Sequence, residues 1–306
     1  MGPTASGKTE LAIRLSSLLP VEIISVDSTQ VYCDLDIGSG KPDSAVLRKT
    51  PHHLIDILPP DQVYSAAQFK SDAVQLIHQI HEKGKIPLLV GGTMMYFHVL
   101  QNGLHTLPES DSATRAMLEA DGEALGWAAM HERLRQIDSD SAARINLGDK
   151  QRIQRALEVY YVTQKTLSEH LKSQKVKSDF NFINFALIPK ETARCVLHDR
   201  INSRFLAMLK DGFVDEVIGL REKYKLHQDL PSMRSVGYRQ VWAYLEHQVD
   251  YETMQVKAMA ATRQLAKRQL TWLRRWPDLI EIDLLAETKT DILIDAIAPR
   301  LYALHK

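Results

Sequence analysis

Residues 2–9 read Gly-Pro-Thr-Ala-Ser-Gly-Lys-Thr and fit the phosphate-binding loop pattern G-x-x-x-x-G-K-[ST]. In such a loop, glycines let backbone N–H groups curl around phosphate oxygens, while the lysine supplies a positive charge and the threonine hydroxyl binds Mg²⁺. Leucines recur at helical spacing over residues 10–19, so the spacing predicts a helix whose positive end faces the anion. A chance glycine-rich turn is the alternative, and the loop and helix together disfavour it.

This kind of loop normally follows a buried β-strand, and here only Met1 precedes it. We therefore expect about ten further residues, one strand with its lead-in, upstream of Met1 in the native protein. A native N-terminus at Met1 or Gly2 would contradict this expectation.

The composition limits the number of domains and the class of protein, but it does not identify a binding partner. The 306 residues suffice for two domains, and 25% charged with 44% hydrophobic residues is typical of soluble globular chains. The net charge is zero, so only its local distribution is informative. Cys33 and Cys195 lack metal-ligand spacing, and we expect two core thiols in a reducing compartment. Without a long apolar run or a signal peptide, we expect a cytoplasmic protein with no membrane contact.

The first hundred residues alternate between strand and helix patterns. Val21–Val26 reads as a buried strand that ends at Asp27, and a second strand over 86–90 runs into the tight turn 91–93. A helix is expected over 65–82, so the alternation predicts a P-loop-type α/β fold, a mostly parallel sheet flanked by helices. Sites in such sheets lie at the carboxyl ends of strands. Asp27 is therefore expected near the phosphate loop, as a base or Mg²⁺ ligand, the alternative being a carboxylate that caps a turn.

Residues 108–178 lack a strong strand pattern and are expected to form a helical insertion domain. Its predicted helices are 113–125, 127–137 and 149–163. The α/β core would then comprise residues 1–107 and 179–306. From Lys150 to Lys177 there are seven Lys or Arg against two Glu, which indicates a polyanion contact.

After a predicted strand over 180–188, two helices carry basic residues. The helix 194–210 places Arg200 and Arg204 one turn apart, as a diphosphate clamp or as an ordinary solvated pair. The helix 253–277 contains six Lys or Arg and no acid, with two interleaved tryptophans. It indicates a polyanionic partner, and a solvated basic face with core tryptophans is the alternative.

Two further features are not interpreted as a dinucleotide-binding or a metal-binding site. The glycine-rich segment 36–42 does not match the dinucleotide-binding pattern. His52 and His53 have no other ligands at metal-binding spacing, so we expect a structural or substrate-facing role.

Taken together, these motifs resemble the bacterial tRNA dimethylallyltransferases of the tRNA isopentenyltransferase family. The resemblance covers essentially the whole chain and rests on residues 2–9, 25–28 with 30–32, 36–38, 51–56, 64–67, 90–93 with Tyr96, 237–239 and 262–269. No single motif is specific, whereas their combination in this order is. The zinc finger of eukaryotic relatives is absent, because two cysteines cannot build one, so the bacterial type is the better match.

The resemblance implies a tRNA-modifying prenyltransferase with Mg²⁺ as cofactor. The loop, although of the nucleotide-binding type found in ATP-binding proteins, would hold dimethylallyl diphosphate. The exocyclic amine of an adenine adjacent to the anticodon would attack the allyl group, and diphosphate would leave. The implied catalytic residues are Asp27 as proton acceptor, Thr9 as metal ligand and Arg204. The implied diphosphate-binding residues are Gly2, Thr4, Ala5, Ser6, Gly7, Lys8, Thr9, Thr93 and Arg200.

The family also implies recognition of the tRNA anticodon stem-loop by a monomer, with the adenine flipped out of its stack. The implied tRNA contacts are Asp27, Ser28, Thr29, Gln30, Thr93, Arg115, Gln151, Arg152, Arg155, Arg234, Gly237, Arg263, Lys267 and Arg268.

Three other functions share parts of this pattern. A shikimate- or nucleotide-type kinase has the loop and the strand-end Asp, but is typically about half as long and has no use for a basic helix with tryptophans. A nucleotide-switch RNA-binding module would need a guanine-reading motif, which we do not find. A plant-type adenylate prenyltransferase differs in its acceptor, so activity on free AMP would identify it.

Overall fold

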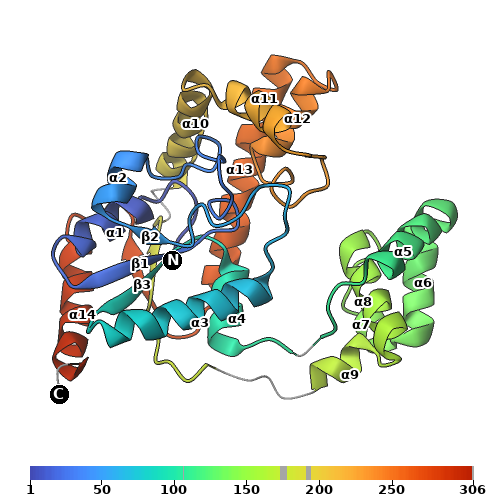
Figure 1. Cartoon of the computed structure of the whole chain (residues 1–306), viewed down its shortest axis with the longest axis horizontal. Helices are drawn as coiled ribbons and strands as arrows, with labels where there is room; N and C mark the ends of the chain where they lie inside the picture. The colour runs from blue at the N-terminus through green and yellow to red at the C-terminus, as the bar shows by residue number, and fades with distance from the viewer. Residues whose placement is uncertain (106, 173–177, 191–193, 305–306) are drawn as a thin grey trace. The chain divides into compact units, whose positions relative to one another are not determined.

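The computed structural model describes residues 1–105, 107–172, 178–190 and 194–304. The chain forms two compact units, one made of 1–100 with 180–306 and the other of 101–179 (Figure 1). The sequence led us to expect the corresponding boundaries at 107/108 and 178/179.

The first unit contains two short parallel sheets. Strand β1 (Val21–Val26) pairs in parallel with β2 (His52–His53) on one side and with β3 (Ile86–Gly91) on the other. Strand β4 (Asn184–Ile188) pairs in parallel with β5 (Leu279–Asp283). The predicted parallel α/β fold is confirmed. The strand expected over 180–188 begins only at Asn184, because the rings before it pack against the core around α3 instead.

Helices cover both faces of β1 and β3. Helix α3 (Ala66–Glu82) buries an apolar stripe against β1, together with α4 (Met94–Asn102). It begins with a capping box, in which the Ser65 hydroxyl accepts from the Gln68 N–H at 3.1 Å and the Gln68 side chain accepts from the Ser65 N–H at 2.8 Å. Helices α1 (Lys8–Ser16) and α14 (Lys289–Leu304) lie on the other face, and α2 (Ser44–Lys49) follows β1.

Helix α1 is shorter than the predicted helix over 10–19. It ends at Ser16, where the hydroxyls of Ser16 and Ser17 donate to the carbonyls of Ile13 and Arg14 at 2.8 and 2.7 Å. Such bonds compete with the backbone for the carbonyls of the last turn.

Four helices extend the first unit: α10 (Arg194–Lys210), α11 (Phe213–Lys223), α12 (Tyr238–Leu245) and α13 (Tyr251–Leu273). They share a core with the loop that follows β1. Helix α13 begins two residues before the predicted start, because the Asp250 carboxylate accepts from the Thr253 N–H at 2.7 Å. The expectation of two core thiols is wrong, because Cys195 is exposed at the start of α10 and Cys33 is half-buried.

The second unit is helical. Its helices are α5 (Ser112–Leu125), α6 (Trp127–Ile137), α7 (Ser139–Ala142), α8 (Lys150–Thr163) and α9 (Leu167–Lys172). Leu118, Met130, Leu134, Ile153 and Leu157 form its core.

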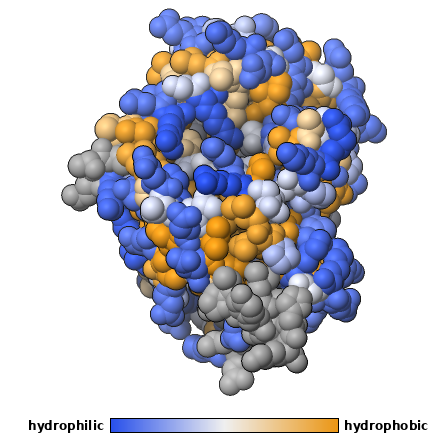
Figure 2. Space-filling model, turned by 90° about the vertical axis from the view of Figure 1, so that its left-hand side faces the viewer, coloured by the Kyte–Doolittle hydropathy of each residue, from blue (hydrophilic) through white to orange (hydrophobic). Residues whose placement is uncertain are grey.

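None of the described helices combines the length and apolarity needed to cross a bilayer. On the face drawn in Figure 2, hydrophilic residues surround smaller apolar groups.

Candidate active site

The phosphate loop opens onto a cavity of about 160 Å³ in the first unit. From the loop and the first turn of α1, Thr4, Ala5, Lys8 and Thr9 line this cavity. The cavity is also bounded by the carboxyl ends of β1 and β3, by α10 and by α13. The phosphate-binding motif therefore forms one wall of a larger chamber.

Two cationic side chains in this chamber, Lys8 and Arg204, are partly removed from water. The Lys8 ammonium donates to the Pro3 carbonyl at 2.6 Å, and burial lowers its pKa to about 8, although Asp27 opposes the shift. Burial also lowers the pKa of Arg204, again against the influence of Asp27. The Arg204 guanidinium donates to the Gly40 carbonyl at 3.4 Å. A bound anion would restore the favourable surroundings that both cations have lost.

Asp27 stands at the end of β1 and lines the same cavity. Its Oδ1 accepts from the N–H groups of Thr29 at 2.9 Å and Gln30 at 3.3 Å, which fixes the carboxylate in a turn. Within the part of the chain that the structure describes, its Oδ2 accepts no hydrogen bond. One oxygen thus orients the group, and the other can accept a proton.

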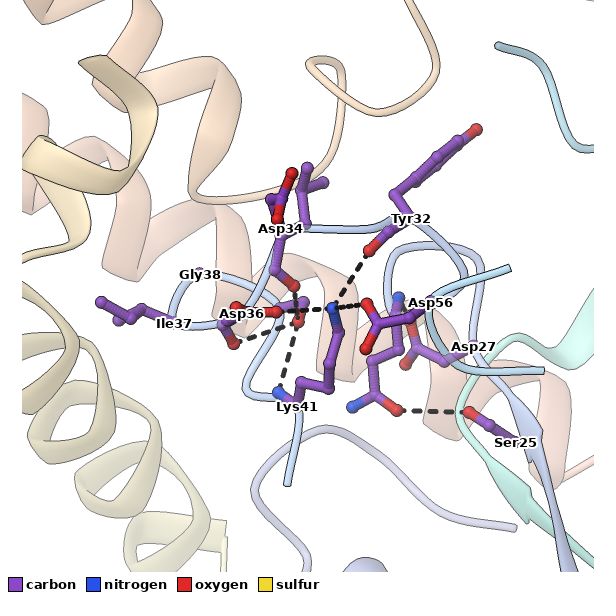
Figure 3. A network of polar contacts seen from close by, with 12 residues as sticks. Ser25, Asp27, Tyr32, Asp34, Asp36, Ile37, Gly38, Lys41 and Asp56 are labelled. Carbon is purple, nitrogen blue, oxygen red and sulfur yellow. Dashed lines mark hydrogen bonds and ion pairs between the residues drawn. The ribbon is translucent and has the colours of Figure 1, made fainter. Parts of the chain in front are cut away.

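A cluster of hydrogen bonds fixes the glycine-rich loop at the cavity wall (Figure 3). The buried Lys41 ammonium binds the Asp36 carboxylate at 2.6 Å, the Tyr32 carbonyl at 3.1 Å and the Asp56 carboxylate. From α11, Glu216 accepts from the backbone N–H groups of Asp36, Ile37 and Gly38 at 3.0, 2.5 and 3.2 Å. Sequence reasoning gave this loop no role, yet residues 38–40 line the cavity.

The remaining wall is apolar. It is formed by Ile201, Phe205, Met208, Phe213, Val236 and Leu265. The first three recur at helical spacing around Arg204 on α10, a pattern that could have revealed an apolar wall beside the clamp. The chamber therefore offers cations at one side and hydrocarbon at another.

The structure brings only some of the predicted site residues together. The predicted residues that line the cavity are Thr4, Ala5, Lys8, Thr9, Asp27, Thr29, Gln30, Arg204 and Gly237. Those that do not are Gly2, Ser6, Gly7, Ser28, Thr93, Arg200, Arg234, Arg263, Lys267 and Arg268. Arg200 is exposed, and the Thr93 hydroxyl accepts from the Ser28 N–H at 3.1 Å.

The predicted tRNA contacts of the second unit lie on α5 and α8. Arg115 and Arg155 bind the fully buried Glu158 carboxylate at 3.0 and 2.7 Å. Arg152 is exposed and pairs with Asp149 at 3.3 Å, while Gln151 is exposed. The two inner arginines are therefore also structural partners of a buried charge.

The donor set in the chamber is compatible with Mg²⁺. The described residues contain no group of three or more His, Cys, Asp or Glu side chains that could hold a metal ion by themselves. Mg²⁺ commonly takes only one or two protein oxygens and completes its shell with phosphates and water. Thr9 and Asp27, which line one cavity, could supply such oxygens.

The chain is similar to known proteins over most of its length. A family model described as IPP transferase matches residues 30–276. The chain belongs to the IPP transferase family. A tRNA dimethylallyltransferase of Legionella pneumophila (strain Paris) is 54% identical over 283 residues, covering 92% of this chain and 90% of that relative. One from Aromatoleum aromaticum is 50% identical over 303 residues, covering 97% and 94%.

A solved member of this family has the same fold. The full-length tRNA isopentenylpyrophosphate transferase of Bacillus halodurans superposes with a TM-score of 0.71 at 34% identity. The alignment covers 99% of this chain and 96% of that chain. The family that the sequence motifs resemble is thus confirmed.

Proposed function

We propose that this IPP transferase family member transfers the dimethylallyl group of dimethylallyl diphosphate to the exocyclic amine of an adenine beside the anticodon of tRNA. The observation that carries the proposal is the chamber itself, where Lys8, Arg204 and the Asp27 carboxylate share one cavity with an apolar wall. An allyl diphosphate needs cations for its head and hydrocarbon for its tail. The names of the relatives, tRNA dimethylallyltransferases, agree with this substrate pair.

In this mechanism, the diphosphate lies against the phosphate loop. The Lys8 ammonium and the Arg204 guanidinium bind its oxygens and stabilise the charge that grows as the carbon–oxygen bond breaks. Preorganised donors of this kind are typically worth about 3 kcal/mol each. Mg²⁺, when held by Thr9 and the phosphates, would supply further positive charge to the leaving group.

Asp27 serves as the proton acceptor. The amine lone pair of adenine is delocalised into the ring, so the amine is a weak nucleophile and its proton must be removed as the new carbon–nitrogen bond forms. The two backbone N–H groups on Oδ1 hold the carboxylate in place, and Oδ2 receives the proton. The apolar wall formed by Ile201, Phe205 and Met208 would exclude water, which could otherwise attack the allyl group.

The RNA would be bound by exposed basic residues. Lys267 and Arg268 are exposed on α13, and Arg263 is held by Asn202 of α10 at 2.8 Å. Cations on a helix beside the chamber suit phosphates of a stem-loop whose adenine is flipped into the cavity. We also propose RNA contacts for four residues of the helical unit: Arg115, Gln151, Arg152 and Arg155. We further propose that the protein is a cytoplasmic monomer.

A prenyl-transfer assay tests the proposal. Purified protein, Mg²⁺ and labelled dimethylallyl diphosphate are incubated with unmodified tRNA, with AMP alone, or with ATP and a small-molecule acceptor mixture. We expect label in tRNA and none in AMP. Label in AMP alone would favour the adenylate prenyltransferase alternative, and ATP-dependent phosphorylation without prenyl transfer would favour a kinase.

A further inference from the structure

The side chain of Gln269 joins helix α13 to the phosphate loop. Its Oε1 accepts from the Thr4 N–H at 2.9 Å, and its Nε2 donates to the Gly92 carbonyl at 2.9 Å. A backbone N–H can only donate and a carbonyl can only accept, so the orientation of the amide is fixed by its partners. Gln269 is 8% exposed and lines the cavity.

The Gln269 amide packs closely against Gly92, and helix α13 also contacts the phosphate loop through apolar side chains. A Cβ added at Gly92 would lie 2.4 Å from the Gln269 Nε2, so any larger residue at this turn would displace the amide. One turn earlier on the same face, the buried Ala266 belongs to an apolar cluster that includes Ala5 of the phosphate loop. Helix α13 therefore holds the loop through both an amide and an apolar contact.

The same helix carries the proposed RNA contacts. Lys267 and Arg268 directly precede Gln269 and are exposed. One helix thus presents cations outward and an amide inward, where Thr4 and Gly92 both line the diphosphate chamber. The proposed RNA-binding residues on α13 are therefore adjacent in sequence to a residue that lines the diphosphate chamber.

We infer that Gln269 is a positioning residue that couples RNA binding on α13 to diphosphate binding at the phosphate loop. The inference rests on the proposed function. RNA that restricts the motion of α13 also restricts Thr4 and Gly92 through the amide, so the diphosphate meets a loop that is already ordered. Two ligands that favour the same ordered state bind with positive cooperativity, and the coupling is reciprocal.

The coupling can be measured with pyrophosphate as the probe. Its dissociation constant is determined by calorimetry for the full chain with Mg²⁺, with and without saturating anticodon stem-loop RNA. We expect RNA to tighten pyrophosphate binding at least about fivefold in the unmodified protein. In Gln269→Met the factor should fall to about one, while the affinity for RNA alone stays within about twofold. Gln264→Met, the same change at an exposed position of α13, should retain the coupling.

Hydrogen exchange provides a second readout that needs no variant. Exchange of the backbone amides of residues 2–9 should slow when RNA alone is added to the unmodified protein. The inference would be overturned if RNA did not slow amide exchange in residues 2–9, or if RNA did not tighten pyrophosphate binding to the unmodified protein. It would also be overturned if a folded Gln269→Met variant kept the full effect of RNA on pyrophosphate binding. If prenyl transfer and RNA binding are intact in these cases, the proposed function survives. If RNA neither binds nor accepts a prenyl group, both fail.

Discussion

Raising the pH from 7 to 9 should weaken diphosphate binding because Lys8 loses its proton. Burial lowers the pKa of this ammonium to about 8 in the free protein. A bound diphosphate stabilises the charged form, so the pKa in the complex is higher than in the free protein. Affinity is therefore constant below the free-protein pKa and is lost as the pH rises through it.

The magnitude follows from the fraction of Lys8 that is charged. With a pKa of about 8, this fraction is roughly ten elevenths at pH 7 and one eleventh at pH 9, so the affinity should fall about tenfold. A saturated alkyl diphosphate is the suitable probe, because it cannot react and because its own last ionisation, with a pKa of about 6, is largely complete at pH 7. The dissociation constant is measured by calorimetry at steps of half a pH unit.

Lys8→Arg is the matched control. Arginine keeps its charge across this range, so the variant should bind more weakly than the unmodified protein but with little dependence on pH. A flat profile for the unmodified protein would show that deprotonation of Lys8 does not control diphosphate binding between pH 7 and 9. An equal fall in Lys8→Arg would do so too, since it would assign the pH dependence to another group.

Three further predictions address the base, the RNA surface and the glycine-rich loop. Asp27→Ala should lower turnover at least about a hundredfold while RNA binding survives, measured by single-turnover prenyl transfer, and near-normal turnover would remove Asp27 from the mechanism. Lys267→Ala with Arg268→Ala should reduce the slope of log affinity for RNA against log salt by about 1.4, and an unchanged slope would mean that these residues do not contact phosphates. Gly38→Ala should lower the free energy of unfolding in urea by about 2–3 kcal/mol, because the new Cβ would lie 2.0 Å from the buried Phe213 ring; a loss below about 0.5 kcal/mol would contradict this packing.

Short sequence motifs and the positions of strand ends are sufficient to predict that the phosphate loop and Asp27 lie at one cavity. The phosphate loop is a contiguous motif, and Asp27 follows from the rule that sites lie at strand ends. Helical spacing alone does not distinguish Arg200 from Arg204 as a ligand of the diphosphate, because both lie on one side of a helix. Only Arg204 reaches the Gly40 carbonyl, so the position of the loop along α10, a tertiary property, separates them.

The residues that sequence reasoning missed act across long chain separations. Gln269 binds Thr4, 265 residues away, and Glu216 binds the loop at Asp36 across 180 residues. Neither contact leaves a periodic or spaced pattern in the sequence. The sequence alone also does not show which basic residues are already paired. Arg115 and Arg155 both bind the fully buried Glu158 carboxylate, a contact that their positions in the sequence do not reveal.

In the proposed reaction, the exocyclic amine of one adenine reacts in the chamber with the allyl diphosphate held at Lys8. The most direct test compares two anticodon stem-loop RNAs that are identical except at the adenine beside the anticodon, where one carries a purine without the amine. Pyrophosphate release and the mass of the nucleosides are measured after a single turnover. We expect one C5H8 addition at that adenine with matching pyrophosphate release. With the amine-free RNA we expect neither the addition nor the release. Prenylation of another nucleotide, or equal release with both RNAs, would contradict the proposed reaction.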